Sequence, residues 1–225
     1  RDQPRSRGLG DVYKRQGYVV KQKRTPLMQK VTVQANTKKK MTPLRSDASA
    51  AYQHYERKNI KIRISAQAKS FTNLKQIQYK FVKKGTSKGS VPYKTGTTLT
   101  LKDGMIGRAY VRFVTDAGID EMQLPGIAVD KKAPTKTKIK VNRSGIKTLK
   151  TSTKTSYNKK IKKSAKFVFS ASYGISGKSK TQYKIVPKGK KASKYRWKTA
   201  NKITYKKKTK KVSIYARFID KCGNI

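Results

Sequence analysis

The sequence has very few of the residues that build catalytic and metal sites. Its 225 residues include one cysteine, one histidine and only 10 acidic residues. The single cysteine, Cys222, excludes an intrachain disulfide. With His54 as the only histidine, a zinc site of Cys and His ligands cannot be assembled. No Gly-x-Gly-x-x-Gly fingerprint or phosphate-binding loop is present, and the Gly-rich segment 85–90 is expected to be a hairpin loop, so we expect neither a metal nor a cofactor.

Long apolar runs are also absent. No stretch approaches the roughly 18 consecutive apolar residues that mark a membrane-spanning helix, so we expect no transmembrane segment. The first residues lack the apolar region of a secretory signal peptide. The location of the protein therefore has to be inferred from other features of the sequence.

What the sequence has in excess is positive charge. Lys and Arg number 58 against 10 Asp and Glu, which gives a formal net charge of +48 at pH 7. Such a surface repels copies of itself and attracts anions. Hydrophobic residues make up 35% of the chain, and Val, Ile, Tyr and Phe recur in an ordered way, so we expect a folded chain.

The N-terminal residues look unrelated to the rest of the chain. The segment DVYKRQ at 11–16 resembles the translation of a transposon end used in sequencing-library preparation, so we expect residues 1–16 to be non-native. Residues 17–24 are expected to be the tail of a preceding repeat. The chain ends at DKCGNI, in the middle of a turn, and we interpret it as a piece of a longer protein.

The remainder of the chain contains two copies of one pattern. YVRFVTDAG at 110–118 matches YARFIDKCG at 215–223 with a shift of 105 residues, and IRISA matches FVFSA with the same shift. Consistent shifts indicate tandem copies of one unit. We assign repeat one to residues 25–129 and a C-terminally truncated repeat two to residues 130–225. The segment VDKKAPT, with its Lys and Pro residues, suits a short linker between them.

Within each copy, apolar residues alternate with polar ones. IKIRIS places Ile60, Ile62 and Ile64 on one face, with Lys61 and Arg63 on the other. Side chains alternate between the two faces of a strand, so a period of two predicts half-buried β-strands. The same alternation is found at 77–81, 109–113, 165–169 and 212–218. Turn signals separate the runs, so the predicted fold class is all-β, with tandem antiparallel β-sandwiches.

These segments resemble a known family, the tandem bacterial immunoglobulin-like (Ig-like) repeats of surface and secreted proteins. The resemblance lies in the opening APT…IKV, in FVFSASYGISGKSKTQYKI and in the closing YARFIDKCGN. Asp220, Gly223 and Asn224 match the closing turn of the family, and Cys222 takes its small-residue position. The resemblance implies tandem Ig-like sandwiches in an extracellular or cell-surface protein. The segment ASYGISG lacks the usual preceding Asp, which argues against a calcium site.

Few side chains are candidates for chemistry, and each has a better structural interpretation. His54 has no visible partner for acid–base catalysis, and a solvated or packed histidine in a loop is expected. Cys222 follows Lys221, a neighbour that lowers thiol pKa values, but its place in a repeated turn favours a small packed residue. Asp116 and Asp120 are the nearest approach to an acid pair, and turn capping is the better interpretation. We expect no catalytic residue and no enzymatic activity.

The single tryptophan lies in KYRWKT, where Tyr195, Arg196 and Trp197 form a candidate ligand contact. An exposed aromatic beside Lys and Arg can stack on a sugar or on a base. Trp197 aligns with Tyr93 of the first copy, and an aromatic in both copies also fits a packing role. The sequence leaves both interpretations open, with packing the more economical one.

Charge and duplication together give the functional expectation. We expect non-catalytic structural or spacer repeats of a bacterial cell-surface or secreted protein, which contact neighbouring repeats in a longer chain. Their Lys-rich faces are expected to associate with anionic cell-wall polymers such as teichoic acid or acidic glycans. One alternative is an adhesin or glycan-binding module that uses Trp197. Another is a non-specific basic nucleic-acid-binding protein; Lys far outnumbers Arg, the usual reader of bases, so no specific nucleic acid is expected.

Overall fold

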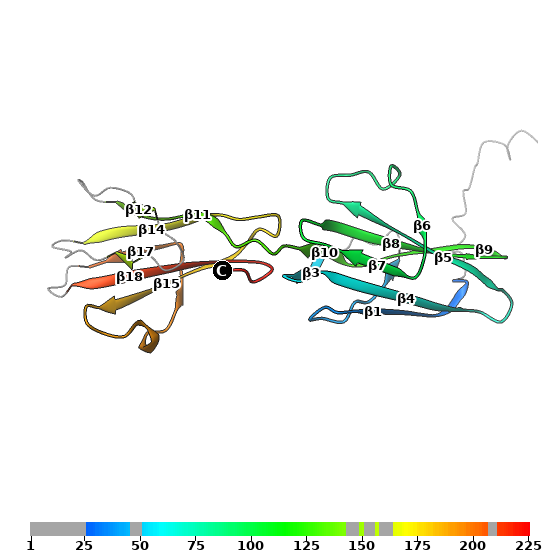
Figure 1. Cartoon of the computed structure of the whole chain (residues 1–225), viewed down its shortest axis with the longest axis horizontal. Coiled ribbons are helices and arrows are strands. Elements are labelled where there is room, and N and C mark those ends of the chain that lie inside the picture. The colour runs from blue at the N-terminus through cyan, green and yellow to red at the C-terminus, as the bar shows by residue number, and fades with distance from the viewer. Residues whose placement is uncertain (1–25, 46–50, 143–148, 151–155, 158–163, 207–210) are drawn as a thin grey trace, which may run out of the picture.

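The computed structural model shows two β-sandwiches placed end to end (Figure 1). It describes residues 26–45, 51–142, 149–150, 156–157, 164–206 and 211–225. We call the sandwich of strands β1 to β10, within residues 28–129, the first unit, and that of β11 to β18, within residues 135–220, the second unit. The segments 1–16 and 17–24, predicted to be a non-native stretch and the tail of an earlier repeat, lie outside the described residues.

Two sheets build the first unit. Its described strands are β1 (Met28–Ala35), β2 (Leu44–Arg45), β3 (Tyr52–Glu56), β4 (Ile60–Ala68), β5 (Leu74–Lys83), β6 (Lys94–Thr95), β7 (Thr98–Leu101), β8 (Ile106–Thr115), β9 (Gly118–Gln123) and β10 (Gly126–Val129). One sheet has the order β1-β4-β7. The other has the order β2-β9-β8-β10-β3, with β5 paired to the second edge of β8 and β6 paired to β5.

The second unit repeats this architecture. Its described strands are β11 (Thr135–Asn142), β12 (Leu149–Lys150), β13 (Ser156–Tyr157), β14 (Ala165–Ser172), β15 (Lys178–Pro187), β16 (Lys198–Thr199), β17 (Lys202–Tyr205) and β18 (Val212–Asp220). They form sheets in the orders β12-β11-β14-β17 and β13-β18-β15-β16. A short 3₁₀ turn, Ala192–Lys194, lies between β15 and β16. The predicted all-β class, with tandem Ig-like β-sandwiches, is confirmed.

One strand pair departs from the predicted antiparallel pattern. β10 runs parallel to β3, with Ile127 opposite His54 and Val129 opposite Glu56, while its other edge pairs antiparallel with β8. The remaining described strand pairs are all antiparallel. Parallel neighbours cannot be joined by a tight turn, and here most of the first unit separates the two strands in the sequence. Alternation of apolar residues carries no information about strand direction, so the sequence could not predict this pair.

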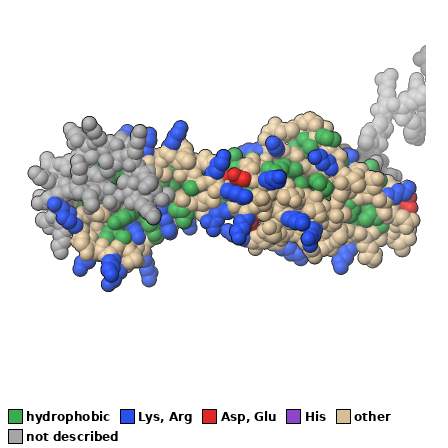
Figure 2. Space-filling model, in the orientation of Figure 1, with side chains coloured by type: hydrophobic (Ala, Val, Ile, Leu, Met, Phe, Trp, Pro, Cys, Tyr) green, Lys and Arg blue, Asp and Glu red, His purple; other side chains and the backbone are tan. Residues whose placement is uncertain are grey.

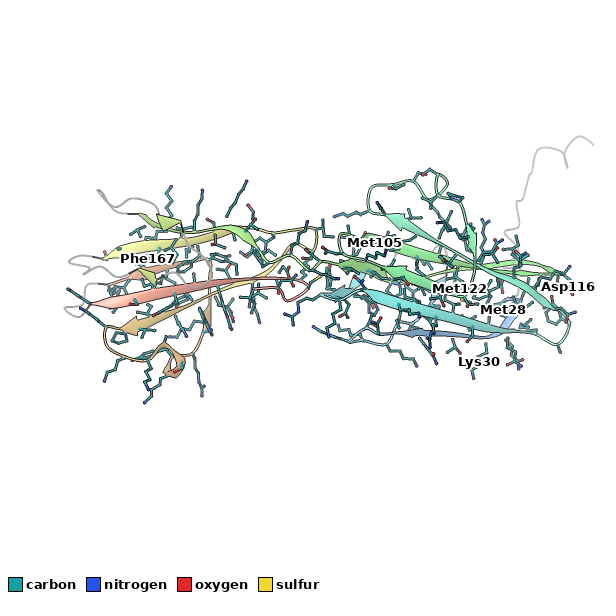
Figure 3. The ribbon with its side chains drawn as sticks, in the orientation of Figure 1. Met28, Lys30, Met105, Asp116, Met122 and Phe167 are labelled. Carbon is teal, nitrogen blue, oxygen red and sulfur yellow. The ribbon has the colours of Figure 1, made fainter. Side chains whose placement is uncertain are left out.

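The predicted inner faces form two separate hydrophobic cores. Ile60, Ile62 and Ile64 of β4 are buried in the first core, together with Phe113 from the facing sheet. The second core contains Phe218, which is the repeat counterpart of Phe113, and Phe167, which lies between the sheets in Figure 3. Each core draws side chains from both of its sheets, and the two cores share no residue. Each sandwich therefore has its own source of hydrophobic stabilisation.

Because the cores are separate, we expect core substitutions to act on one unit at a time. Phe218→Ala should destabilise the second unit by about 3–5 kcal/mol through lost burial and the cavity left behind. Trp197 is the single tryptophan and reports on this unit, so its fluorescence transition should move to lower urea concentration. Phe113→Ala is the matched control and should move that transition less, because it leaves the second core intact, while the circular dichroism of the first unit changes earlier. Equal shifts of the Trp197 transition in both variants would contradict independent units.

Candidate functional site

Trp197 follows the 3₁₀ turn between β15 and β16, and its ring contacts two cations. Lys184 of β15 places its Nζ 4.6 Å from the centre of the Trp197 ring system. Arg217 of β18 places its guanidinium carbon 4.4 Å from the same centre. Cations over an aromatic face are attracted by the ring quadrupole, more strongly where water is partly removed. We call Lys184, Trp197 and Arg217 the second cradle.

The other two residues of the predicted ligand contact lie in the same loop but play no part in these cation contacts. Tyr195 is half-buried and Arg196 is exposed. The cations beside Trp197 come instead from the neighbouring strands β15 and β18. The proposed contact of Tyr195, Arg196 and Trp197 with a ligand stays a prediction, and the structure adds two residues to its surroundings.

The first unit contains the same arrangement at repeat-matched positions. Lys80 Nζ lies 4.4 Å and the Arg112 guanidinium carbon 3.9 Å from the centre of the Tyr93 ring. We call Lys80, Tyr93 and Arg112 the first cradle. In both units the lysine also ties down the overlying loop, because Lys80 Nζ donates to the carbonyl of Lys88 and Lys184 Nζ to that of Ala192, each over 2.7 Å. Both units therefore hold this loop against the outer face of the sheet in the same way.

The first cradle is occupied by a carboxylate of its own unit. Glu121 of β9 accepts hydrogen bonds from Lys88, from the Tyr93 hydroxyl and, over 3.1 Å, from Arg112 Nε. Burial opposes ionisation of Glu121, but these donors outweigh it and hold its pKa below the ordinary value. Burial and the hydrogen bond to Glu121 raise the pKa of Tyr93. Burial, the largest cause, and the neighbouring cations lower the pKa of Lys80, although Glu121 opposes them.

Among the described residues, no carboxylate of the second unit contacts the second cradle. Arg217 Nε donates to the neutral amide oxygen of Gln182 over 2.8 Å, and burial lowers the pKa of Arg217. Between residues 131 and 225 the sequence contains one acidic residue, Asp220. Asp220 is 1% exposed, and both of its carboxylate oxygens accept hydrogen bonds from Asn224. The two cations of the second cradle are therefore arranged like those of the first, and the position that matches Glu121 falls after Ile225.

Sequence reasoning missed the cations of both cradles because alternation assigned them to a solvent-facing side of their strands. Lys80 is only 6% exposed, since the loop that carries Tyr93 covers it. The loop itself was predicted correctly, because residues 85–90 lie in the connection between the antiparallel strands β5 and β6. A Lys, an aromatic and an Arg recur in this order in both copies, with spacings that agree to within one residue, and that recurrence was the available signal.

The two units meet at a joint built around Asp130. Its Oδ2 accepts hydrogen bonds from the backbone N–H of Ser176 over 3.1 Å and from the Ser176 hydroxyl over 2.7 Å. Its Oδ1 accepts the N–H of Lys132 over 3.1 Å, and its own N–H donates to the carbonyl of Glu56 over 3.0 Å. A Cβ on Gly174 would approach Oδ2 to 2.7 Å, so this loop position has no room for a side chain. Asp130 thus connects the last strand region of the first unit to a loop of the second.

The closing turn of the second unit contacts the same joint. Asn224 Nδ2 donates to the carbonyl of Asp130 over 2.7 Å, and Asp220 holds Asn224 in place. Cys222 is buried, with its Sγ 3.7 Å from the carbonyl of Ala128. Burial raises the pKa of the Cys222 thiol to about 11, so at neutral pH it stays protonated and weakly reactive. The turn residues on which the family resemblance rests therefore connect the units.

The remaining candidates for chemistry do not converge. Asp116 accepts hydrogen bonds from Thr72 and Asn73 at the end of the first unit that lies away from the joint (Figure 3), and these hold its pKa at about 2. Asp120 accepts the N–H groups of Leu27 and Met28 instead. Each carboxylate thus ties down a separate loop or strand start rather than forming an acid pair.

His54 lies in strand β3 and not in a loop. It is 2% exposed, and neither ring nitrogen has a hydrogen-bond partner among the described residues. Burial lowers the pKa of His54, against the opposing effect of Glu56. The packed alternative of the sequence interpretation is the one found, and the imidazole is kept neutral.

The described residues contain no group of three or more His, Cys, Asp and Glu side chains placed to hold a metal ion. Over the same residues, no helix has the length and apolar character needed to cross a membrane.

Comparisons with known proteins add little. No protein-family model and no curated protein matches this chain. Among solved structures the chain is similar to the FN1-FN3 domains of chicken CNTN1, with a TM-score of 0.31 and 12% sequence identity over 80% of this chain. The chain spans 64% of the length of that structure. The Ig-like assignment therefore rests on the strands and sheets described above.

His54 should make the first unit sensitive to mild acid. Its folded-state pKa lies below the ordinary 6.5, so the unfolded chain takes up a proton first as the pH falls. The stability contributed by the neutral imidazole is complete above the unfolded-state pKa and is lost as the pH falls through the folded-state pKa. His54→Met should flatten the fall in urea midpoint, followed by circular dichroism, between about pH 7 and about pH 5. The control Asp116→Asn should keep the wild-type slope in this range, and an unchanged slope in His54→Met would contradict the assignment.

Proposed function

We propose that this chain consists of non-catalytic spacer repeats of a bacterial cell-surface or secreted protein, whose Lys-rich faces associate with anionic cell-envelope polymers. The observation that supports the spacer role most strongly is the buried joint. Cys222 is 1% exposed and contacts the carbonyl of Ala128 in the first unit. Asp130 is 2% exposed; its N–H donates to the carbonyl of Glu56 in the first unit, while its carboxylate and carbonyl accept hydrogen bonds from Ser176 and Asn224 of the second. Breaking them would leave buried polar groups without partners, which costs about 1–3 kcal/mol for each group.

The same joint explains how such repeats would act as a spacer. Two more contacts bridge the units at its rim: the Arg57 side chain reaches the carbonyl of Gly223, and Lys221 lies 5.4 Å from the ring centre of Tyr55. With a short linker between the sandwiches, hinging would leave the buried polar groups of the joint without partners, so these contacts favour the extended arrangement in Figure 1. An array of such units would hold an attached domain at a set distance from the cell.

The charge supports the envelope partner. Lys and Arg side chains are spread over both units on the face in Figure 2 and are not gathered into one patch. A surface of one sign attracts polyanions without a shaped site, and such attraction is screened by salt. Teichoic acids and acidic glycans are the polyanions that a cell-surface protein would meet.

Two other functions share part of this support. A glycan-binding module is favoured by the second cradle, in which two cations contact the ring of Trp197, in the loop of Tyr195 and Arg196. Nucleic acid would also be attracted, through phosphates alone, with a strong dependence on salt. The described residues include no α-helix that could enter a groove, so sequence-specific reading is not proposed.

A rigid joint predicts a particular scattering curve. The chain should scatter X-rays in solution as an elongated two-unit particle with a narrow distribution of shapes. Asp130→Ala removes the Ser176 hydrogen bonds and should broaden the distribution of interatomic distances, because the units then hinge. Asp116→Ala removes a comparable loop-capping carboxylate away from the joint and should leave the curve unchanged. A compact wild-type particle, or identical curves for wild type and Asp130→Ala, would contradict the spacer role.

Envelope association predicts salt-dependent sedimentation with isolated bacterial cell walls. The chain should pellet with walls at low ionic strength, and the bound fraction should fall steeply as salt approaches the physiological range, where the screening length is about 8 Å. Walls stripped of teichoic acid and acidic glycan are the control and should retain far less protein. Equal retention on stripped walls would contradict binding to the anionic polymers.

A further inference from the structure

Strand β3 provides much of the first unit's side of the joint. Figure 1 shows β3 and β10 at the end of the first unit that faces the second. The carbonyl of Glu56, the last residue of β3, accepts the N–H of Asp130 over 3.0 Å. The ring of Tyr55 lies 5.4 Å from Lys221 Nζ, and Arg57, directly after the strand, donates to a carbonyl of the closing turn of the second unit. These contacts between the units therefore depend on where β3 lies.

The attachment of β3 to its own sandwich is limited. It lies at the edge of its sheet, and among the described strands β10 is its only partner. The pairing covers four positions, is parallel, and contains a register shift, and parallel pairing is slightly less stable per residue than antiparallel pairing. No residue of β3 belongs to the hydrophobic core cluster of the first unit. A strand of this kind belongs to the parts of a fold that open locally before the whole fold does.

An ionisable side chain of β3 faces inward. His54 lies opposite Ile127 of β10 and is 2% exposed, and neither ring nitrogen has a hydrogen-bond partner among the described residues. Burial is the main cause that lowers the pKa of His54; Glu56 opposes this effect, and Lys39, from the segment after β1, adds to it. The residues of β10 carry no ionisable side chain. Glu56 is itself buried and already accepts the N–H of Lys38 over 3.0 Å, so an imidazolium here would lack a counter-charge of its own.

We propose that His54 is an acid-sensitive switch of the joint: when its imidazole takes up a proton from the solvent, β3 leaves the edge of the sheet and the two units are released from their extended arrangement. A buried cation is costly unless it is paired or hydrated, so the protonated ring is stable only where water reaches it. This inference goes beyond the spacer role by giving the spacer two states, and it rests on the same joint.

The release would affect the joint and leave the second sandwich intact. When β3 leaves the sheet, Asp130 loses the carbonyl of Glu56 as its acceptor. The carboxylate of Asp130 keeps the hydrogen bonds from Ser176, and its carbonyl keeps the one from Asn224, because both partners belong to the second unit. The second unit thus retains its anchors, while the first unit becomes free to turn about the linker. Mild acid would convert a stiff spacer into a jointed one.

The single histidine makes this step measurable. NMR spectra of the full chain contain imidazole C–H signals from His54 alone, so its proton uptake can be followed without a variant. We expect that uptake between about pH 6.5 and about pH 5, a range above the ordinary pKa of carboxyl groups. The small-angle scattering curve should broaden with the same midpoint. Amide hydrogen exchange in β3, corrected for its intrinsic pH dependence, should become about 10-fold faster or more, whereas exchange in β15 should not change.

Variants connect the response to the imidazole. His54→Met removes the titrating group and should keep the narrow distance distribution at both pH 7.5 and pH 5. Asp130→Ala is the positive control and should give the broad distribution at both pH values, because it opens the joint from the other side. Circular dichroism at pH 7.5 checks that each variant is folded. The comparison of NMR and scattering midpoints uses the wild-type chain, so it tests the switch even if His54→Met does not fold.

The outcomes separate this inference from the spacer role. Proton uptake by His54 with an unchanged scattering curve would overturn the switch and leave the rigid spacer in place. Equal broadening of wild type and folded His54→Met at pH 5 would also overturn it, because another group would then cause the response. A broad distribution for the wild-type chain at pH 7.5 would overturn the rigid spacer itself, and the switch with it.

Discussion

Carboxylates are scarce in this chain, and the few that it has decide how its parts are held together. The described acidic residues are Glu56, Asp103, Asp116, Asp120, Glu121, Asp130 and Asp220. Each of them accepts at least one hydrogen bond, and for all except Glu121 at least one donor is a backbone N–H group. A carboxylate that accepts backbone N–H groups fixes a loop or a strand start, whereas one that pairs with an exposed Lys contributes little. Most Lys and Arg side chains therefore have no carboxylate available to pair with, and the carboxylates serve to hold loops and strand starts in place.

The sequence was sufficient to predict the two sandwiches and their core residues, but not the direction and pairing of every strand. The residues Ile60, Ile62 and Ile64 are inside because period-two alternation and burial are the same physical fact in a two-layer fold. The same alternation does not determine the direction of a strand or the neighbours at its edges. Nothing in the local pattern shows that β10 runs parallel to β3, because that pairing is decided by the path of the chain between them.

The candidate site was predicted only in part, for a related reason. Trp197 was found because a tryptophan among cations is conspicuous, whereas its partner Arg217 lies in β18, twenty residues away in the sequence. Glu121 could not be found by comparing the copies, because its counterpart would fall beyond Ile225. Lys80 was assigned to solvent because alternation describes a strand alone and takes no account of a loop folded over it.

The joint shows how one loop can be secured from two different sources. Thr72 and Ser176 occupy matching positions in the two units, and each donates its hydroxyl to a carboxylate. For Thr72 that carboxylate is Asp116 of the same unit, whereas Lys221 stands at the matching position of the second unit. Ser176 relies on Asp130, which precedes the first strand of its own sandwich. Recombination that exchanged such units between genes would therefore have to transfer the linker aspartate with the unit that follows it, and a cut placed after it would separate the second sandwich from one of its own anchors.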